Sequence, residues 1–191
     1  NLAAEWRAGR PSLTGGADGQ DLDVRTSQDA QSDVSASTSL TLDGDTGRVT
    51  AATQARGNYL AGTATNAQMA IDATQAVSGD VTATTIITGT DARLVGGGQI
   101  GAAAFGNTVA LAGGASGDNR ASLIGTIDQT ASGEVRATNQ ASPRFVRAPA
   151  EFSSQAVANP VQATTGPSAN QELDVRQRSS GAMVEAGTGV W

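Results

Sequence analysis

A pattern that recurs about every fifty residues constrains the fold of this chain more than any other feature of its sequence. The segment 106–139 opens with Gly-Asn, runs through an apolar alternation into Gln, and closes with Ser-Gly-acid-Val-x-Ala-Thr, and the segment 57–85 follows the same scheme. Such self-similarity is typical of arrays in which one unit cannot bury its apolar face alone. We therefore expect the copies to stack on one another.

Amide side chains mark the register of the copies. One glutamine closes the alternation in each of four copies: Gln28, Gln75, Gln129 and Gln177. An apolar residue stands six positions after each glutamine: Val34, Val81, Val135 and Met183. A second ladder consists of Asn58, Asn107 and Asn159. We expect equivalent amides to stack at corners and to form hydrogen bonds between copies, as they do in cross-β assemblies. This structural interpretation is preferred to a role in ligand contact.

Period-two alternation with β-branched residues predicts strands throughout, and no window keeps the helical spacing free of Gly and Thr. The expected fold class is all-β, a repetitive β-solenoid or β-helix in which each copy supplies two or three rungs of short parallel strands. With aromatic residues at only 3%, Ala, Val, Ile and Leu must fill a narrow interior. The alternative is an antiparallel β-sandwich made of two duplicated halves.

The domain organisation follows from where the pattern starts. Residues 1–19 lack the Gly-Asn opening and are interpreted as an N-terminal cap or linker. Residues 20–191 are predicted to form one repetitive β domain, with copies centred near 28, 75, 129 and 177. Pro143 and Pro149 bracket a segment that is expected to be a protruding loop or a sheet edge, because proline lacks the amide that a ladder needs.

Charge excludes several classes of partner. A net charge of −6 and a pI near 4.5 argue against binding to nucleic acid or to an anionic membrane surface. The sequence shows neither an apolar stretch long enough for a transmembrane helix nor a signal-peptide pattern, so a chain that starts at Asn1 is interpreted as processed or truncated. The absence of cysteine excludes a disulfide framework.

Catalytic and metal-binding residue types are scarce. Histidine, cysteine and lysine are all missing, which excludes the usual nucleophile and base pairs and imidazole or thiolate metal ligands. We therefore predict neither an enzyme nor a cofactor. Asp43 and Asp45, on either side of Gly44, resemble the front half of a calcium loop. Because the closing bidentate glutamate is missing, a simple acidic turn is the preferred interpretation.

Two families of surface fibres resemble this chain. The segment 117–129, with Gly and Asn followed by an alternation into Gln129, is similar to the shorter repeats of curlin-like amyloid subunits. The Gly-Asn openings, the segment 128–138 (DQTASGEVRAT) and the Pro-flanked Phe-Val segment 143–149 resemble the holdfast attachment proteins of stalked alphaproteobacteria, over residues 20–180. The second resemblance implies an extracellular anchor or fibre subunit on the bacterial outer-membrane surface, without enzymatic activity.

The expected function is thus a surface anchor or fibre subunit that attaches an adhesive polysaccharide to the cell envelope. Its expected partners are further copies of itself, other envelope anchor proteins and the polysaccharide. We expect residues 1–19 of one subunit to meet the last copy of another, with Trp6 or Trp191 as the buried anchor. The alternatives are a phage or viral tail fibre and a β-helix enzyme acting on polysaccharide.

Overall fold

The computed structural model describes the backbone of residues 2–9 and 12–18, together with residues 21–89, 91–115, 120–143, 145–181 and 183–190. Strand accounts for 76% of the structure, and the described residues contain no helix. The prediction of an all-β chain is confirmed. Its physical basis is the alternation of small or β-branched inward residues with polar outward ones, as in β8, where buried and half-buried positions alternate.

The strands fall into four successive turns of the chain. The first turn comprises β1 (Leu2–Gly9), β2 (Ser12–Asp18), β3 (Leu22–Ala30), β4 (Val34–Thr41) and β5 (Asp45–Thr46). The second comprises β6 (Val49–Thr65), β7 (Gln68–Val77), β8 (Val81–Thr88) and β9 (Arg93–Leu94). The third comprises β10 (Gly98–Gly114), β11 (Ala121–Ala131), β12 (Val135–Ala141) and β13 (Phe145–Val146). The fourth comprises β14 (Ala150–Val157), β15 (Val161–Thr165), β16 (Ala169–Ser179) and β17 (Val184–Val190).

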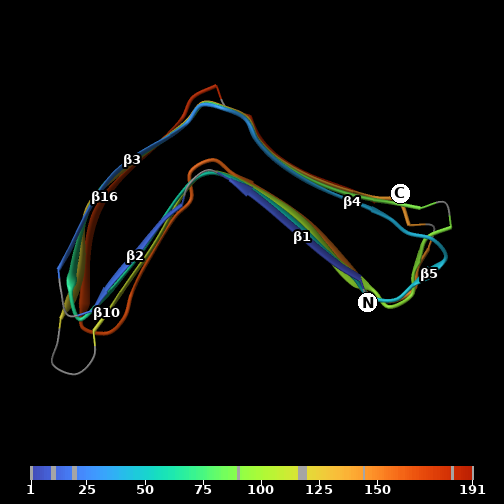
Figure 1. The fold of residues 1–191 in the computed structure, drawn as a ribbon, viewed down its shortest axis with the longest axis horizontal. Coiled ribbons are helices and arrows are strands. Elements are labelled where there is room, and N and C mark those ends of the chain that lie inside the picture. Colours follow the sequence, from blue (N-terminus) through green and yellow to red (C-terminus); the bar gives the residue numbers. More distant parts are fainter. Residues whose placement is uncertain are drawn as a thin grey trace.

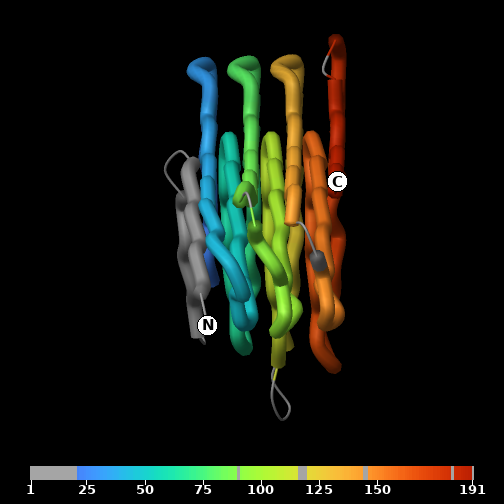
Figure 2. Tube along the Cα trace, turned by 90° about the vertical axis from the view of Figure 1, so that its right-hand side faces the viewer, coloured from blue at the N-terminus to red at the C-terminus, as the bar shows by residue number. Residues whose placement is uncertain are grey.

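Each strand pairs in parallel with its equivalent in the next turn. The sheets run in the orders β1-β6-β10-β14, β16-β11-β7-β3, β17-β12-β8-β4 and β13-β9-β5, with β2 beside β6 and β15 beside β10. Figure 2 shows the turns lying side by side along the molecule. All described strand pairs are parallel.

Each turn is a flattened loop that is bent in the middle, so that the stacked turns form two layers (Figure 1). The concave layer consists of β1, β2, β6, β10, β14 and β15, and the convex layer consists of β3, β7, β11 and β16 in one arm and β4, β8, β12 and β17 in the other. The short strands β5, β9 and β13 close the end of the second arm.

Apolar side chains fill the space between the layers in three clusters. The cluster at the bend contains small residues such as Ala55, Val77 and Val135. The clusters in the arms contain larger ones, including Met69, Leu123 and Ile127 in the first arm and Leu42, Ile87, Leu94 and Ile100 in the second. Each fully buried aliphatic side chain of this size contributes roughly 1.5–3 kcal/mol.

The Gly-Asn opening of the copies lies at the bend of the concave layer. Gly57 and Asn58 are consecutive buried residues, so the alternation of inward and outward side chains along β6 shifts by one position there. A Cβ on Gly57 would lie 2.5 Å from the carbonyl oxygen of Gly106, and a Cβ on Gly106 would lie 2.3 Å from that of Ala158. Glycine is required because the backbones of neighbouring turns approach too closely for any side chain.

The structure differs from the predicted register at one place. Val135 pairs with Val184 and not with Met183, although Gln129 pairs with Gln177 as the spacing predicts. The link between β16 and β17 is therefore one residue longer than its equivalents, and the prediction for Met183 is wrong. The segment between Pro143 and Pro149 contains β13, which is an edge strand of its sheet.

The N-terminal segment contributes two strands to the concave layer. The strands β1 and β2 pair with β6 in the positions that β14 and β15 occupy beside β10. The boundary between residues 1–19 and 20–191 stays a prediction.

Candidate functional site: amide ladders inside the bend

The four glutamines of the repeat form a continuous ladder in the convex layer. Nε2 of Gln75 donates to Oε1 of Gln28 at 2.6 Å, Gln129 donates to Gln75 at 2.8 Å, and Gln177 donates to Gln129 at 2.9 Å. Gln75 and Gln129 are fully buried. The parallel register makes this possible, because it places chemically identical side chains directly above one another.

The three asparagines form a second ladder in the concave layer. Nδ2 of Asn58 donates to Oδ1 of Asn107 at 2.8 Å, and Asn107 donates to Asn159 at 2.7 Å. Asn58 is 3% exposed and Asn107 is fully buried. The asparagines donate toward later turns, whereas the glutamines donate toward earlier ones.

The amides also join the two layers. Asn58 and Asn107 each donate a second hydrogen bond across the bend, to the carbonyl oxygens of Ala76 at 2.6 Å and Thr130 at 2.9 Å. In return, Gln75 donates to the carbonyl oxygen of Thr108 at 3.3 Å. Each such bond contributes about 0.5–1.5 kcal/mol net, and leaving a buried amide without its partner costs about 1–3 kcal/mol. The ladders therefore fix both the stacking and the spacing of the layers.

A third polar row lies in the second arm, and the sequence interpretation missed it. Thr38, Thr85, Asn139 and Thr188 occupy equivalent positions. The hydroxyl of Thr85 is 2.6 Å from that of Thr53 in the opposite layer, and Nδ2 of Asn139 donates to the carbonyl oxygen of Ile100 at 2.7 Å. The sequence did contain a signal for this row, because each of the strands β4, β8, β12 and β17 has a polar residue at a position that the period-two pattern assigns to the interior.

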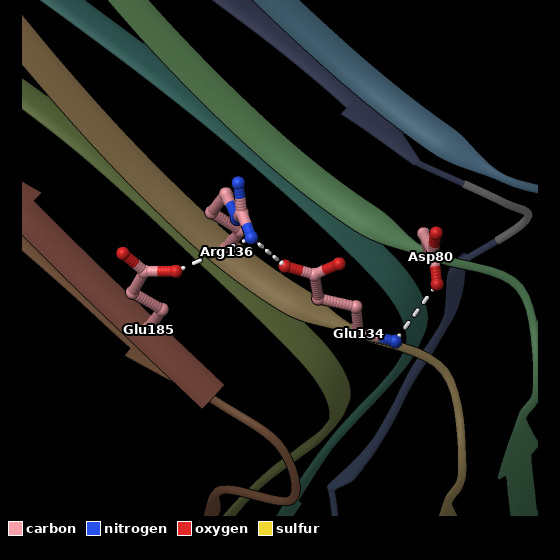
Figure 3. A network of polar contacts seen from close by, with 4 residues as sticks. All are labelled: Asp80, Glu134, Arg136 and Glu185. Carbon is pink, nitrogen blue, oxygen red and sulfur yellow. Dashed lines mark hydrogen bonds and ion pairs between the residues drawn. The ribbon is translucent and has the colours of Figure 1, made fainter. Parts of the chain in front are cut away.

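Acidic side chains at the entry to β8 and β12 connect successive turns on the surface (Figure 3). The carboxylate of Asp33 accepts a hydrogen bond from the backbone N–H of Asp80 at 2.9 Å, and that of Asp80 accepts one from Glu134 at 2.8 Å. Arg136 then joins Glu134 at 2.5 Å to Glu185 of the fourth turn at 3.3 Å. The acid of the Ser-Gly-acid motif thus aligns the turns.

The remaining predicted site residues lie apart from the ladders. Asp43 is exposed, and Asp45 forms an ion pair with Arg93 at 3.0 Å. Among the described residues, no group of three or more acidic side chains is placed to hold a metal ion. The backbone of Trp6 pairs with Thr53, and Trp191 lies outside the described residues. Sheet pairing thus places Trp6, on β1 of the first turn, beside β6 of the second turn.

These features define a class: an all-β protein with parallel sheets, whose buried polar residues form hydrogen bonds between one turn and the next. The family described as Holdfast attachment protein D (HfaD) matches residues 3–191, and the chain belongs to this family. The resemblance found in the sequence is thereby confirmed, and the match extends it into the N-terminal segment. No curated protein matches the chain, and no solved structure matches it.

The family description indicates the function and location of the chain in general terms. Its description gives the chain a role in holdfast attachment and implies a location at the cell surface or envelope. In the described part of the chain, no helix is long and apolar enough to cross a membrane.

Proposed function

We propose that the protein is a non-enzymatic surface anchor whose four turns stack as a β-solenoid and hold an adhesive polysaccharide on the outer surface of the cell envelope. The observation that carries this proposal is the continuous glutamine ladder, which runs through all four turns of a member of a holdfast attachment family. An anchor must resist separation of its parts, and every turn here is held to the next by backbone and side-chain hydrogen bonds.

Polymerisation through the ends of the stack belongs to this proposal. The fourth turn exposes Val175, Val184 and Val190 at 39%, 45% and 50%, at the positions where Ile127, Val135 and Ala141 are buried in the third turn. The edge strands β14 to β17 offer backbone groups that another strand can pair with. A second copy that adds its first turn here forms a heterologous contact, which extends into a fibre if the rotation does not close. Trp6 lies on β1 of that first turn.

The two alternative functions gain no support from the family match, which names neither a tail fibre nor an enzyme. A deletion strain tests the anchor function. Cells that lack the chain should release their adhesive polysaccharide into the medium, and expression of the wild-type chain should restore its retention on the envelope. Retention without the chain, or release of oligosaccharides by the purified protein, would argue against a non-enzymatic anchor.

A further inference from the structure

Four strands of the concave layer, β6, β10, β14 and β15, carry far fewer charges than the convex arm that contains β3, β7, β11 and β16. The other convex arm, β4, β8, β12 and β17, is similarly poor in charge, with only Arg136 and Glu185. The strands β6, β10, β14 and β15 carry only Arg56 and Glu151 as charged residues. The convex strands β3, β7, β11 and β16 carry many more: Asp23, Arg25, Asp29, Asp72, Asp128, Glu172, Asp174, Arg176 and Arg178. In an acidic chain, a nearly uncharged face favours an uncharged partner, because it offers no more than a single charge of either sign to a strongly charged one.

Small side chains hollow this face on both sides of the bend. One hollow, of about 270 Å³, is lined by Ala52, Gln54, Gly101, Ala103, Ser153 and Gln155. The other, of about 280 Å³, is lined by Ala61, Thr63, Ala110, Ala112, Gln162 and Thr164. Each hollow crosses strands of three neighbouring turns and therefore runs along the stack. Both combine alanine with amide and hydroxyl groups, which suit a neutral ligand with many hydroxyls.

Between the hollows, at the bend, lies an arginine packed on two aromatic rings. The guanidinium carbon of Arg56 is 4.8 Å from the ring centre of Tyr59 and 5.4 Å from that of Phe105. The rings hold the guanidinium in place through cation–π attraction. Nε of Arg56 is buried and has no hydrogen-bond partner among the described residues. A buried donor without a partner is costly. The residue as a whole is only half-buried, so a ligand on the concave face can contact its side chain from the solvent side.

The spacing of the turns matches a sugar chain better than a peptide. Neighbouring strands lie about 4.8 Å apart, which is close to the length of one pyranose residue in an extended polysaccharide. A linear glycan along the stack can therefore repeat its contacts once per turn. An extended peptide rises about 3.3 Å per residue and falls out of step with the turns.

We infer that the concave face, over β6, β10, β14 and β15, binds a linear uncharged polysaccharide that lies along the stack. The hollow lined by Ala52, Gln54 and Ala103 receives the sugar rings, and Arg56, two residues after Gln54 on the same face of β6, donates to their hydroxyl or ring oxygens. This inference rests on the proposed anchor function, since it assigns the polysaccharide a site on the protein.

Calorimetric titration of the full chain with cellohexaose and mannohexaose tests the inference, with hexagalacturonate as the charged probe. Arg56→Ala removes the donor, and Ala103→Leu fills one hollow. Arg25→Ala and Ala70→Leu are the matched controls, because both residues face outward on the convex layer. Circular dichroism and melting curves confirm that each variant folds. We expect an uncharged hexasaccharide to bind, with affinity reduced about tenfold or more by each concave variant and unchanged by the controls.

The inference fails if neither uncharged probe binds, if hexagalacturonate binds more tightly, or if the convex variants weaken binding as much as the concave ones. Binding of an unstructured peptide that competes with the glycan would also overturn it. The anchor function is judged separately. If cells that express the folded Arg56→Ala chain retain the polysaccharide as fully as wild-type cells do, the concave site is wrong and the anchor function still stands. If cells without the chain also retain it, the anchor function itself is wrong.

Discussion

Gln129 donates its side-chain amide to Gln75 at 2.8 Å, although the two residues lie 54 positions apart in the chain. The asparagine ladder across the bend runs in the opposite direction, with Asn58 donating to Asn107. The amide dipoles of the two ladders are therefore antiparallel, and the bend accumulates little net dipole along the stack. Because Asn58, Asn107 and Gln75 also bond to the backbone of the other layer, removal of one of these side chains affects both directions of packing.

Replacement of a ladder amide by alanine should destabilise the fold. Gln129→Ala and Asn107→Ala should each lower the free energy of unfolding by about 1–3 kcal/mol, since the buried amides of Gln75 and Asn58 each lose a partner without a replacement. Urea denaturation followed by circular dichroism measures the loss. Gln140→Ala, at an exposed position on β12, is the control and should have little effect. Unchanged midpoints for both ladder variants would place these amides on an ordinary solvated surface.

A charge in the ladder should make stability depend on pH. Gln129→Glu sets a buried carboxyl beside Oε1 of Gln75, an acceptor, so that only the protonated acid can donate there. Burial raises the pKa of such a carboxyl in the folded state above its unfolded value of about 4.3. The folded state then binds the extra proton, so the variant should lose stability relative to wild type as pH rises above about 4.3.

Melting temperatures of the Gln129→Glu variant and wild type at pH 4 and pH 7 check this dependence. The deficit of the variant should be larger at pH 7. Gln140→Glu, with its side chain in water, should show the same small difference at both values. An equal deficit for Gln129→Glu at the two pH values would mean that the carboxyl reaches solvent.

The ladder residues could be found from the sequence, because identical side chains at a fixed period can stack only in a parallel register. The all-β class followed from the same alternation. The carbonyl partners of the amides could not be predicted from the sequence, because Ala76 and Thr130 accept with backbone oxygens, which every residue type has. The shift from Met183 to Val184 was missed because a link one residue longer changes the register without changing the motif on either side. The concave grouping of Arg56 with Phe105 depends on pairing between turns.

A methyl group at the bend should disturb the stacking. In Gly57→Ala, the added Cβ would lie 2.5 Å from the carbonyl oxygen of Gly106, and backbone of the next turn cannot move without breaking its ladder. We expect a loss of about 1–3 kcal/mol, as for other overpacked sites. Urea denaturation measures it, with Gly187→Ala as the matched control because nothing lies within 4 Å of its added Cβ. Equal stability of the two variants would show that the turns can separate at the bend.

Association through the fourth turn should depend on its exposed valines. Val184→Asp places a charge on the end of the stack, where a further turn would bury it, so the variant should stay monomeric under conditions in which the wild-type chain forms larger species. Light scattering after size-exclusion chromatography over a range of concentrations measures the mass. Thr88→Asp, at an exposed position on β8 in the second turn, adds the same charge away from both ends of the stack and should associate as wild type does. If the wild-type chain stays monomeric at the highest concentration, the polymer proposal fails and a monomeric anchor remains. If both variants lose association equally, the contact depends on net charge and not on the apolar end of the fourth turn.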